Sequence, residues 1–226
     1  MLKGAYGPKI GVEDRYVIKA FTDNIVFGYP IRDRGDPEVE LGSALSILSL
    51  FQLNMANAGF FIRGAISIGD LYIDDVVVVG KGFTEAYSGE SQFARDPRII
   101  MTPSSAAAVK RHLEYYAIQY YSPPNRDLYQ DSDEQLFLNY LECVLIAEED
   151  QGPFYEALEK HRRMIEQKLS EFKMTPTIWS KYFWVANYHN FFCSQYPKHF
   201  DESHMVDLAK FQLRPSRLSE FPNSHD

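Results

Sequence analysis

Apolar residues alternate with other residues along positions 15 to 29, on both sides of the polar turn at 22–24. Alternation with a period of two is typical of strands, so this pattern predicts a β-hairpin with Asp23 at its tip. From Glu38 the apolar spacing changes to three and four residues, at Leu41, Leu45, Leu48, Phe51 and Met55. That period predicts a helix, and Gly59 is its expected C-terminal cap.

The pattern from 60 to 115 predicts further strands and helices in alternation. We expect a strand at 60–69, a hairpin at 70–79, a helix at 83–93, a strand at 98–101 and a helix at 102–115. The element order β-β-α-β-β-α-β-α favours an α+β fold, in which helices pack on a mixed sheet.

Beyond residue 115 the composition changes. Residues 116–135 are rich in turn formers and tyrosine, which predicts a loop, and a short strand-like run follows at 136–141. The segments 153–172 and 176–192 have helical periodicity. We therefore expect one domain at 1–115 and a mainly helical C-terminal extension at 116–226.

Composition and charge narrow the classes of function. The chain has 226 residues, of which 45% are hydrophobic, and a formal net charge of -8. An acidic chain lacks the basic surface that binds nucleic acid or anionic lipid, so neither is an expected partner. Two isolated cysteines, Cys143 and Cys193, favour a reducing compartment, and no apolar run approaches the ~20 residues of a membrane span. We expect a cytoplasmic protein.

Two segments are candidates for phosphate or metal chemistry. Gly80-Lys81-Gly82 follows an apolar strand and precedes a helix, where free amides favour anions. Glu85 stands where a G-x-G-x-x-G motif needs its third glycine, so a plain turn is favoured. Asp23 has two interpretations, an ordinary turn aspartate or an oxygen ligand for Mg²⁺.

Arg63 lies in a predicted strand, on the face opposite to the isoleucines. A phosphate or an acidic side chain would each satisfy its charge, and the spacing favours neither. Zinc is a weaker hypothesis, because the possible ligands match no standard zinc spacing and their places favour packing or surface roles. Those residues are His189, Cys193, His199 and His204.

Three stretches occur in a recognisable order. They are "FTDNIVFGYPI" (21–31), "IRGAISIGDLY" (62–72) and "VVGKGFTEAYSGES" (78–91). Together they resemble the second half of a class III nucleotidyl cyclase catalytic domain. The resemblance implies a cyclase-like mixed sheet with packed helices and a homodimer with active sites at its interface. It also implies two divalent ions, Mn²⁺ or Mg²⁺.

The resemblance assigns roles to individual residues. Asp23 takes the place of a metal-binding aspartate, and Arg63 that of an arginine that contacts the triphosphate. Thr84 replaces the asparagine that orients the ribose, and Ser88 replaces the transition-state arginine. Val77 stands where a purine-selecting aspartate is expected, which favours a pyrimidine substrate. Substrate-binding residues are therefore expected to be Arg63, Val77, Lys81 and Thr84, with Arg63 and Thr84 also catalytic.

The family opens with a strand that carries the first metal aspartate, ahead of the hairpin. Glu13 and Asp14 directly precede the hairpin here, so they cannot occupy that strand. We expect either that upstream sequence supplies the strand or that this ligand has been lost.

The C-terminal stretches "DEQLFLNYL", "LEKHRRMIEQKL" and "KYFWVANYHNFFC" are similar to those of the bacterial Pycsar pyrimidine cyclases. This resemblance implies conversion of UTP, or CTP, to the cyclic nucleotide and pyrophosphate during phage infection. The product then activates a separate effector protein. The alternative is a catalytically inactive cyclase-like module that binds a nucleotide or a partner.

Overall fold

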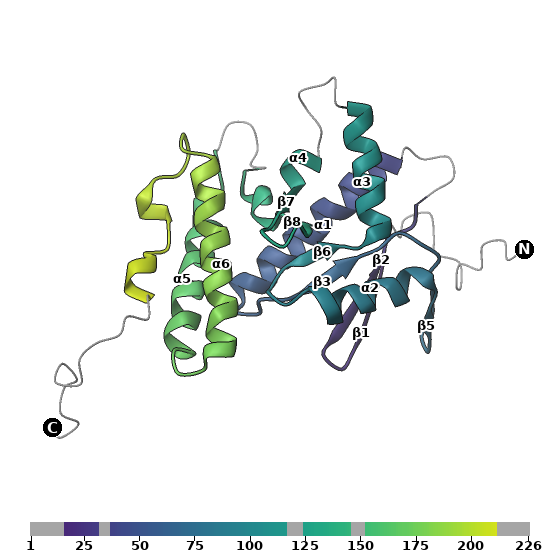
Figure 1. Ribbon diagram of the computed structural model, residues 1–226, viewed down its shortest axis with the longest axis horizontal. Coiled ribbons are helices and arrows are strands. Elements are labelled where there is room, and N and C mark those ends of the chain that lie inside the picture. The colour runs from purple at the N-terminus through teal and green to yellow at the C-terminus, as the bar shows by residue number, and fades with distance from the viewer. Residues whose placement is uncertain (1–15, 32–36, 117–123, 146–151, 212–226) are drawn as a thin grey trace, which may run out of the picture.

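The computed structural model describes residues 16–31, 37–116, 124–145 and 152–211, and Figure 1 shows how their elements are arranged. Strands β1 (Val17–Phe21) and β2 (Asn24–Gly28) pair antiparallel, with Ile18 opposite Phe27, which confirms the predicted hairpin. Within the described ranges these two strands form a sheet of their own. The hairpin extends away from the larger sheet (Figure 1).

Helix α1 (Pro37–Asn57) confirms the helical spacing that begins near residue 38. It ends at Asn57, and Gly59, the residue predicted to cap it, follows two positions later with a φ of 90° and donates its amide to the carbonyl of Ala56. A positive φ is easily adopted by glycine, which explains this residue at the helix end. Leu41 and Leu45 are buried against the larger sheet, so α1 covers one of its faces.

The larger sheet has four strands in the order β3-β6-β8-β7. Strands β3 (Gly64–Ile66) and β6 (Ile99–Met101) are parallel, whereas β6 pairs antiparallel with β8 (Leu136–Leu138) and β8 with β7 (Leu128–Gln130). A parallel pair needs a crossover connection. Here it consists of the hairpin β4 (Tyr72–Ile73) and β5 (Val78–Val79), followed by helix α2 (Lys81–Phe93).

Side chains of β6 alternate between two apolar clusters, as a strand with helices on both faces requires. Ile99 and Met101 pack in the cluster of α1, which also includes Val109 of α3 (Pro103–Tyr116). Ile100 points to the opposite face and packs in the cluster of Phe137 and Tyr188. The sheet is therefore buried on both sides.

The predicted loop at 116–135 is wrong at 124–130, because these residues form the short helix α4 (Pro124–Asp127) and strand β7. Strand β7 spans three residues among turn formers, so its local pattern is weak. The strand predicted at 136–141 is confirmed as β8, and it leads into the 3₁₀ helix η1 (Tyr140–Val144). Two strands of the sheet thus come from beyond residue 115.

Helices α5 (Tyr155–Glu171) and α6 (Pro176–Gln195) confirm the two long helical patterns and lie side by side at one end of the molecule (Figure 1). The short 3₁₀ helices η2 (Glu202–His204) and η3 (Leu208–Phe211) run along them. The combination of small sheets and helices confirms an α+β class. None of the helices in the described ranges is both long and apolar enough to cross a membrane.

Candidate functional site

The glycines before α2 allow two parts of the backbone to approach closely. Gly80 has a φ of 139°, and a Cβ atom there would lie 2.1 Å from the carbonyl oxygen of Asp70. The amide of Gly82 donates to the same carbonyl at 3.1 Å, and the Ser67 hydroxyl donates to the carbonyl of Gly82 at 2.5 Å. Glycine is therefore favoured at positions 80 and 82 because the start of α2 packs closely against the segment that follows β3.

Two of the predicted substrate-binding residues, Lys81 and Thr84, lie on the first turn of α2. Lys81 and Thr84 are both exposed on that turn. The Thr84 hydroxyl donates to the carbonyl of Gly80 at 3.1 Å, so it is oriented along the helix. Val77 is 40% exposed in the neighbouring β4–β5 hairpin, and its amide donates to Asp74. This end of α2 presents an ammonium and a hydroxyl to solvent, and the hairpin before it presents the apolar side chain of Val77.

Arg63 lies at the other end of α2. Its guanidinium Nε is 2.7 Å from Glu90 Oε1, and its Nη1 donates to the carbonyl of Ala94 at 3.3 Å. An acidic partner was one of the two alternatives that the sequence left open. Glu90 is about 9 Å from Thr84 along the helix axis, at 1.5 Å per residue. The structure therefore separates Arg63 from the groups on the first turn of α2.

Asp23 is exposed at the turn of the β1–β2 hairpin. Its Oδ1 accepts hydrogen bonds from the Thr22 hydroxyl at 3.1 Å and the Asn24 amide at 3.0 Å. The part of the chain that the structure describes contains no group of three His, Cys, Asp or Glu side chains that could hold a metal ion. Among the described residues, Asp23 is therefore an exposed carboxylate outside any such group.

Glu85, which interrupts the glycine motif, caps the following helix α3. Its Oε1 accepts a hydrogen bond from the Ser104 amide at 2.9 Å, and the Ser104 hydroxyl accepts one from the Ile68 amide at 2.9 Å. Burial acts to raise the pKa of Glu85, but hydrogen bonds from Ser104 and Thr102 outweigh it and lower that pKa. One signal in the sequence indicates this role, the helix start at Thr102-Pro103. The amide of Ser104 lies in the first turn of that helix, where it has no partner within the helix and needs an acceptor from elsewhere.

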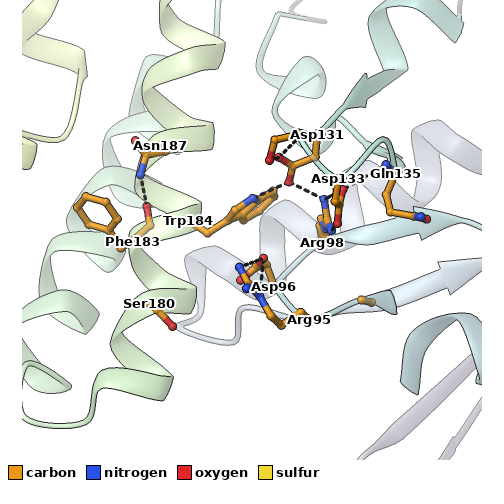
Figure 2. Close-up of polar contacts among 12 residues, drawn as sticks. Arg95, Asp96, Arg98, Asp131, Asp133, Gln135, Ser180, Phe183, Trp184 and Asn187 are labelled. Carbon is orange, nitrogen blue, oxygen red and sulfur yellow. Dashed lines mark hydrogen bonds and ion pairs between the residues drawn. The ribbon is translucent and has the colours of Figure 1, made fainter. Parts of the chain in front are cut away.

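Sequence reasoning missed a polar network around Arg98, which Figure 2 shows. Arg98 is 2% exposed, and its guanidinium donates to Asp131 Oδ2 at 2.5 Å and to both carboxylate oxygens of Asp133. The indole nitrogen of Trp184 donates to the same Asp131 oxygen at 2.7 Å, and its ring lies 5.6 Å from the guanidinium carbon. The network connects β6, the β7–β8 turn and α6.

Comparison with known proteins leaves the chain without an identified relative. No protein-family model, no curated protein and no solved structure matches it. The cyclase resemblance therefore depends on the motifs themselves.

Proposed function

We propose that this protein is a pyrimidine nucleotide cyclase, which converts UTP or CTP to the 3′,5′-cyclic nucleotide and pyrophosphate. Its product would act as the signal of a bacterial anti-phage defence system and activate a separate effector. The observation that best supports this proposal is the exposure of Lys81 and Thr84 on the first turn of a 13-residue helix. A helix start with a nearby ammonium group favours a polyphosphate.

In the proposed reaction the ribose 3′ oxygen attacks the α-phosphorus. A new oxygen–phosphorus bond forms, the bond from the α-phosphorus to the bridging oxygen breaks, and pyrophosphate leaves with the electron pair. The 3′ hydroxyl gives up its proton, which passes to water or to the departing pyrophosphate. Lys81 would offset the negative charge of the triphosphate at the first turn of α2, and Arg63 would do so from the other end of the helix after release from Glu90. Thr84 would position the ribose through its hydroxyl. The side chain of Val77, which has no hydrogen-bonding group, would contact the base.

The proposal includes two divalent ions, which would neutralise phosphate charge and favour ionisation of the 3′ hydroxyl. Asp23 is the residue proposed to bind metal, because an exposed carboxylate is a suitable ligand for Mg²⁺ or Mn²⁺. Its described neighbours do not complete such a site. We therefore assign no reaction step to a metal held by the described residues.

We also propose a homodimer with active sites at the interface. One face of the β1–β2 hairpin carries Tyr16, Ile18, Ala20 and Ile25, which are all exposed. Tyr16, Ile18 and Ile25 are 43%, 51% and 47% exposed, and this part of the hairpin face has no charged side chain. Exposed apolar surface of this kind marks a protein contact. A second copy on this face would lie close to the hairpin that carries Asp23.

The test is incubation of the protein with each of the four nucleoside triphosphates and Mn²⁺, followed by chromatography of the products. We expect cyclic UMP, or cyclic CMP, from the native protein and at least a 100-fold lower rate from Asp23→Ala. The matched control is Asp75→Ala, which removes an exposed aspartate from the other hairpin turn. No cyclic product from any nucleotide would exclude the cyclase, and a cyclic purine as main product would contradict the role given to Val77.

A catalytically inactive, nucleotide-binding module is the second candidate function. It is favoured by the ion pair between Arg63 and Glu90, because this pair engages the guanidinium that the cyclase would need for the triphosphate. Titration calorimetry with UTP and CTP distinguishes the two candidates. Binding without any cyclic product would support the module, whereas turnover would exclude it.

A further inference from the structure

The segment after α6, residues 197–211, lies along helices α5 and α6 and is here called the strap (Figure 1). Two neighbouring residues of α6 hold its backbone. His189 Nε2 is 2.9 Å from the carbonyl oxygen of His204. The Asn190 side chain donates to the Val206 carbonyl and accepts from the Val206 amide, each at 2.8 Å. Val206 itself is 2% exposed, in an apolar cluster with residues of α5 and α6.

Behind the strap lies a buried hydrogen-bonded relay. His161 of α5 and His189 of α6 are both 0% exposed, and their Nδ1 atoms are 2.9 Å apart. The Tyr140 hydroxyl lies 2.8 Å from His161 Nε2. The relay thus runs from η1 through both helices to the carbonyl of His204 in the strap.

The partners at the strap end determine the protons along the relay. A carbonyl oxygen only accepts, so His189 carries its proton on Nε2 and offers a lone pair at Nδ1. His161 therefore donates from Nδ1 and accepts at Nε2, where the Tyr140 hydroxyl donates. Each hydrogen bond then has one proton, and both imidazoles are neutral.

In the described part of the chain, the negative group that acts on His189 is Glu159, which makes no described hydrogen bond to the ring. The ring of Phe61 lies 5.7 Å from that of His161, and no carboxylate forms a described hydrogen bond to either imidazole. Glu159 of α5 is engaged by Arg162 at 2.7 Å, and the His204 ring by Asp201 at 2.9 Å. The charged or titratable groups that act on the two imidazoles, apart from each other, are Arg162 and Glu159 of α5 and His204 of η2.

We infer that the strap is a pH-sensitive latch, which closes over neutral histidines and opens on mild acidification. An open strap admits water to His189, which then binds a proton with its ordinary affinity. The closed strap excludes that proton, because a charge would be buried without a counterion. Acid therefore favours the open state by mass action, and no part of this reasoning depends on the proposed cyclase activity.

The direction and size of the effect follow from the two states of His189. Burial lowers the pKa of His189 to about 4 in the closed state, from an ordinary value of 6.5. Above pH 6.5 His189 is neutral in both states, so the closed state has its full stability. As the pH falls from 6.5 towards 4, the open state binds a proton that the closed state excludes, and this stability is lost. From His189 alone, the opening constant should rise about 30-fold between pH 7.5 and pH 5.

Hydrogen–deuterium exchange of peptides from the strap tests this inference, after correction for the intrinsic exchange rate at each pH. We expect protection to fall about 30-fold between pH 7.5 and pH 5 in the native protein. The His189→Gln variant keeps a donor and an acceptor but cannot titrate, so its strap protection should not change with pH. Asn190→Ala is the matched control, which should lower protection at every pH and keep the pH dependence.

Equal pH dependence in native protein and His189→Gln would overturn the inference, as would constant protection in the native protein. A second measurement decides the question if the glutamine variant does not fold. NMR titration of the native histidine rings should leave His189 neutral down to pH 5. A His189 ring that becomes charged near pH 6.5 with the strap still protected would contradict the latch.

Discussion

Replacement of Arg98 by methionine should cost this protein a large part of its stability. The guanidinium is buried and connects two carboxylates with the Trp184 ring (Figure 2). Loss of one member of a fully buried ion pair costs about 3–5 kcal/mol, because the remaining charge is unpaired. Here the carboxylate side chains of Asp131 and Asp133 are 20% and 50% exposed, so solvent stabilises part of the remaining charge. We therefore expect a loss of about 2–4 kcal/mol.

Urea unfolding, followed by tryptophan fluorescence and circular dichroism, measures this loss directly. Methionine preserves most of the apolar volume, so the change reports mainly on the charge and its hydrogen bonds. Arg163→Met is the matched control, because the Arg163 side chain is 60% exposed in its pair with Glu159, and we expect less than about 0.5 kcal/mol. A loss at Arg98 no greater than that at Arg163 would refute the reasoning.

Two further predictions concern stability. Gly80→Ala should cost about 2–4 kcal/mol in urea unfolding, because the new Cβ would collide with the Asp70 carbonyl at a φ of 139°. Gly42→Ala, in open space on α1, should be neutral or slightly stabilising, and equal effects of the two would contradict this explanation. Burial raises the pKa of Glu142 above the ordinary carboxyl value. Glu142 therefore stabilises the folded state fully at a pH below the ordinary carboxyl pKa, and this stabilisation is lost as the pH rises through the raised pKa. Glu142→Gln, which can still accept the Tyr196 hydrogen bond, should be more stable than the native protein at pH 7 but not at pH 4. Thermal unfolding at both pH values measures this, and an equal change at both would show that the Glu142 charge has no role.

Much of the local structure was predictable because it depends on local chemistry. The β1–β2 hairpin follows from alternation around a polar turn, and α1 follows from its apolar period and Gly59. Strand β7 was not predictable in this way, since it is short and is stabilised by pairing with β8. The order of strands in the sheet likewise depends on contacts between distant segments.

The candidate site was predictable to a smaller extent. Thr84 was expected in the first turn of a helix at 83–93 and does lie in the first turn of α2, but the helix begins two residues earlier and so includes Lys81, which was expected to precede it. The ion pair of Arg63 with Glu90 was only one of two alternatives, because nothing in the local pattern connects these positions. The burial of Arg98 left no sequence signal, since its partners are 33 and 35 residues away in the chain.

The completion of the larger sheet by β8 and β7 has a consequence for synthesis on the ribosome. Strands β3 and β6 leave the ribosome first, but the second neighbour of β6 emerges only with residues 136–138, and Trp184 emerges later still. A nascent chain that stalls between these points would expose the unpaired edge of an apolar strand, Ile99–Met101. Such an edge is a template for pairing with other chains. Translation speed across this interval should therefore affect how much protein escapes aggregation.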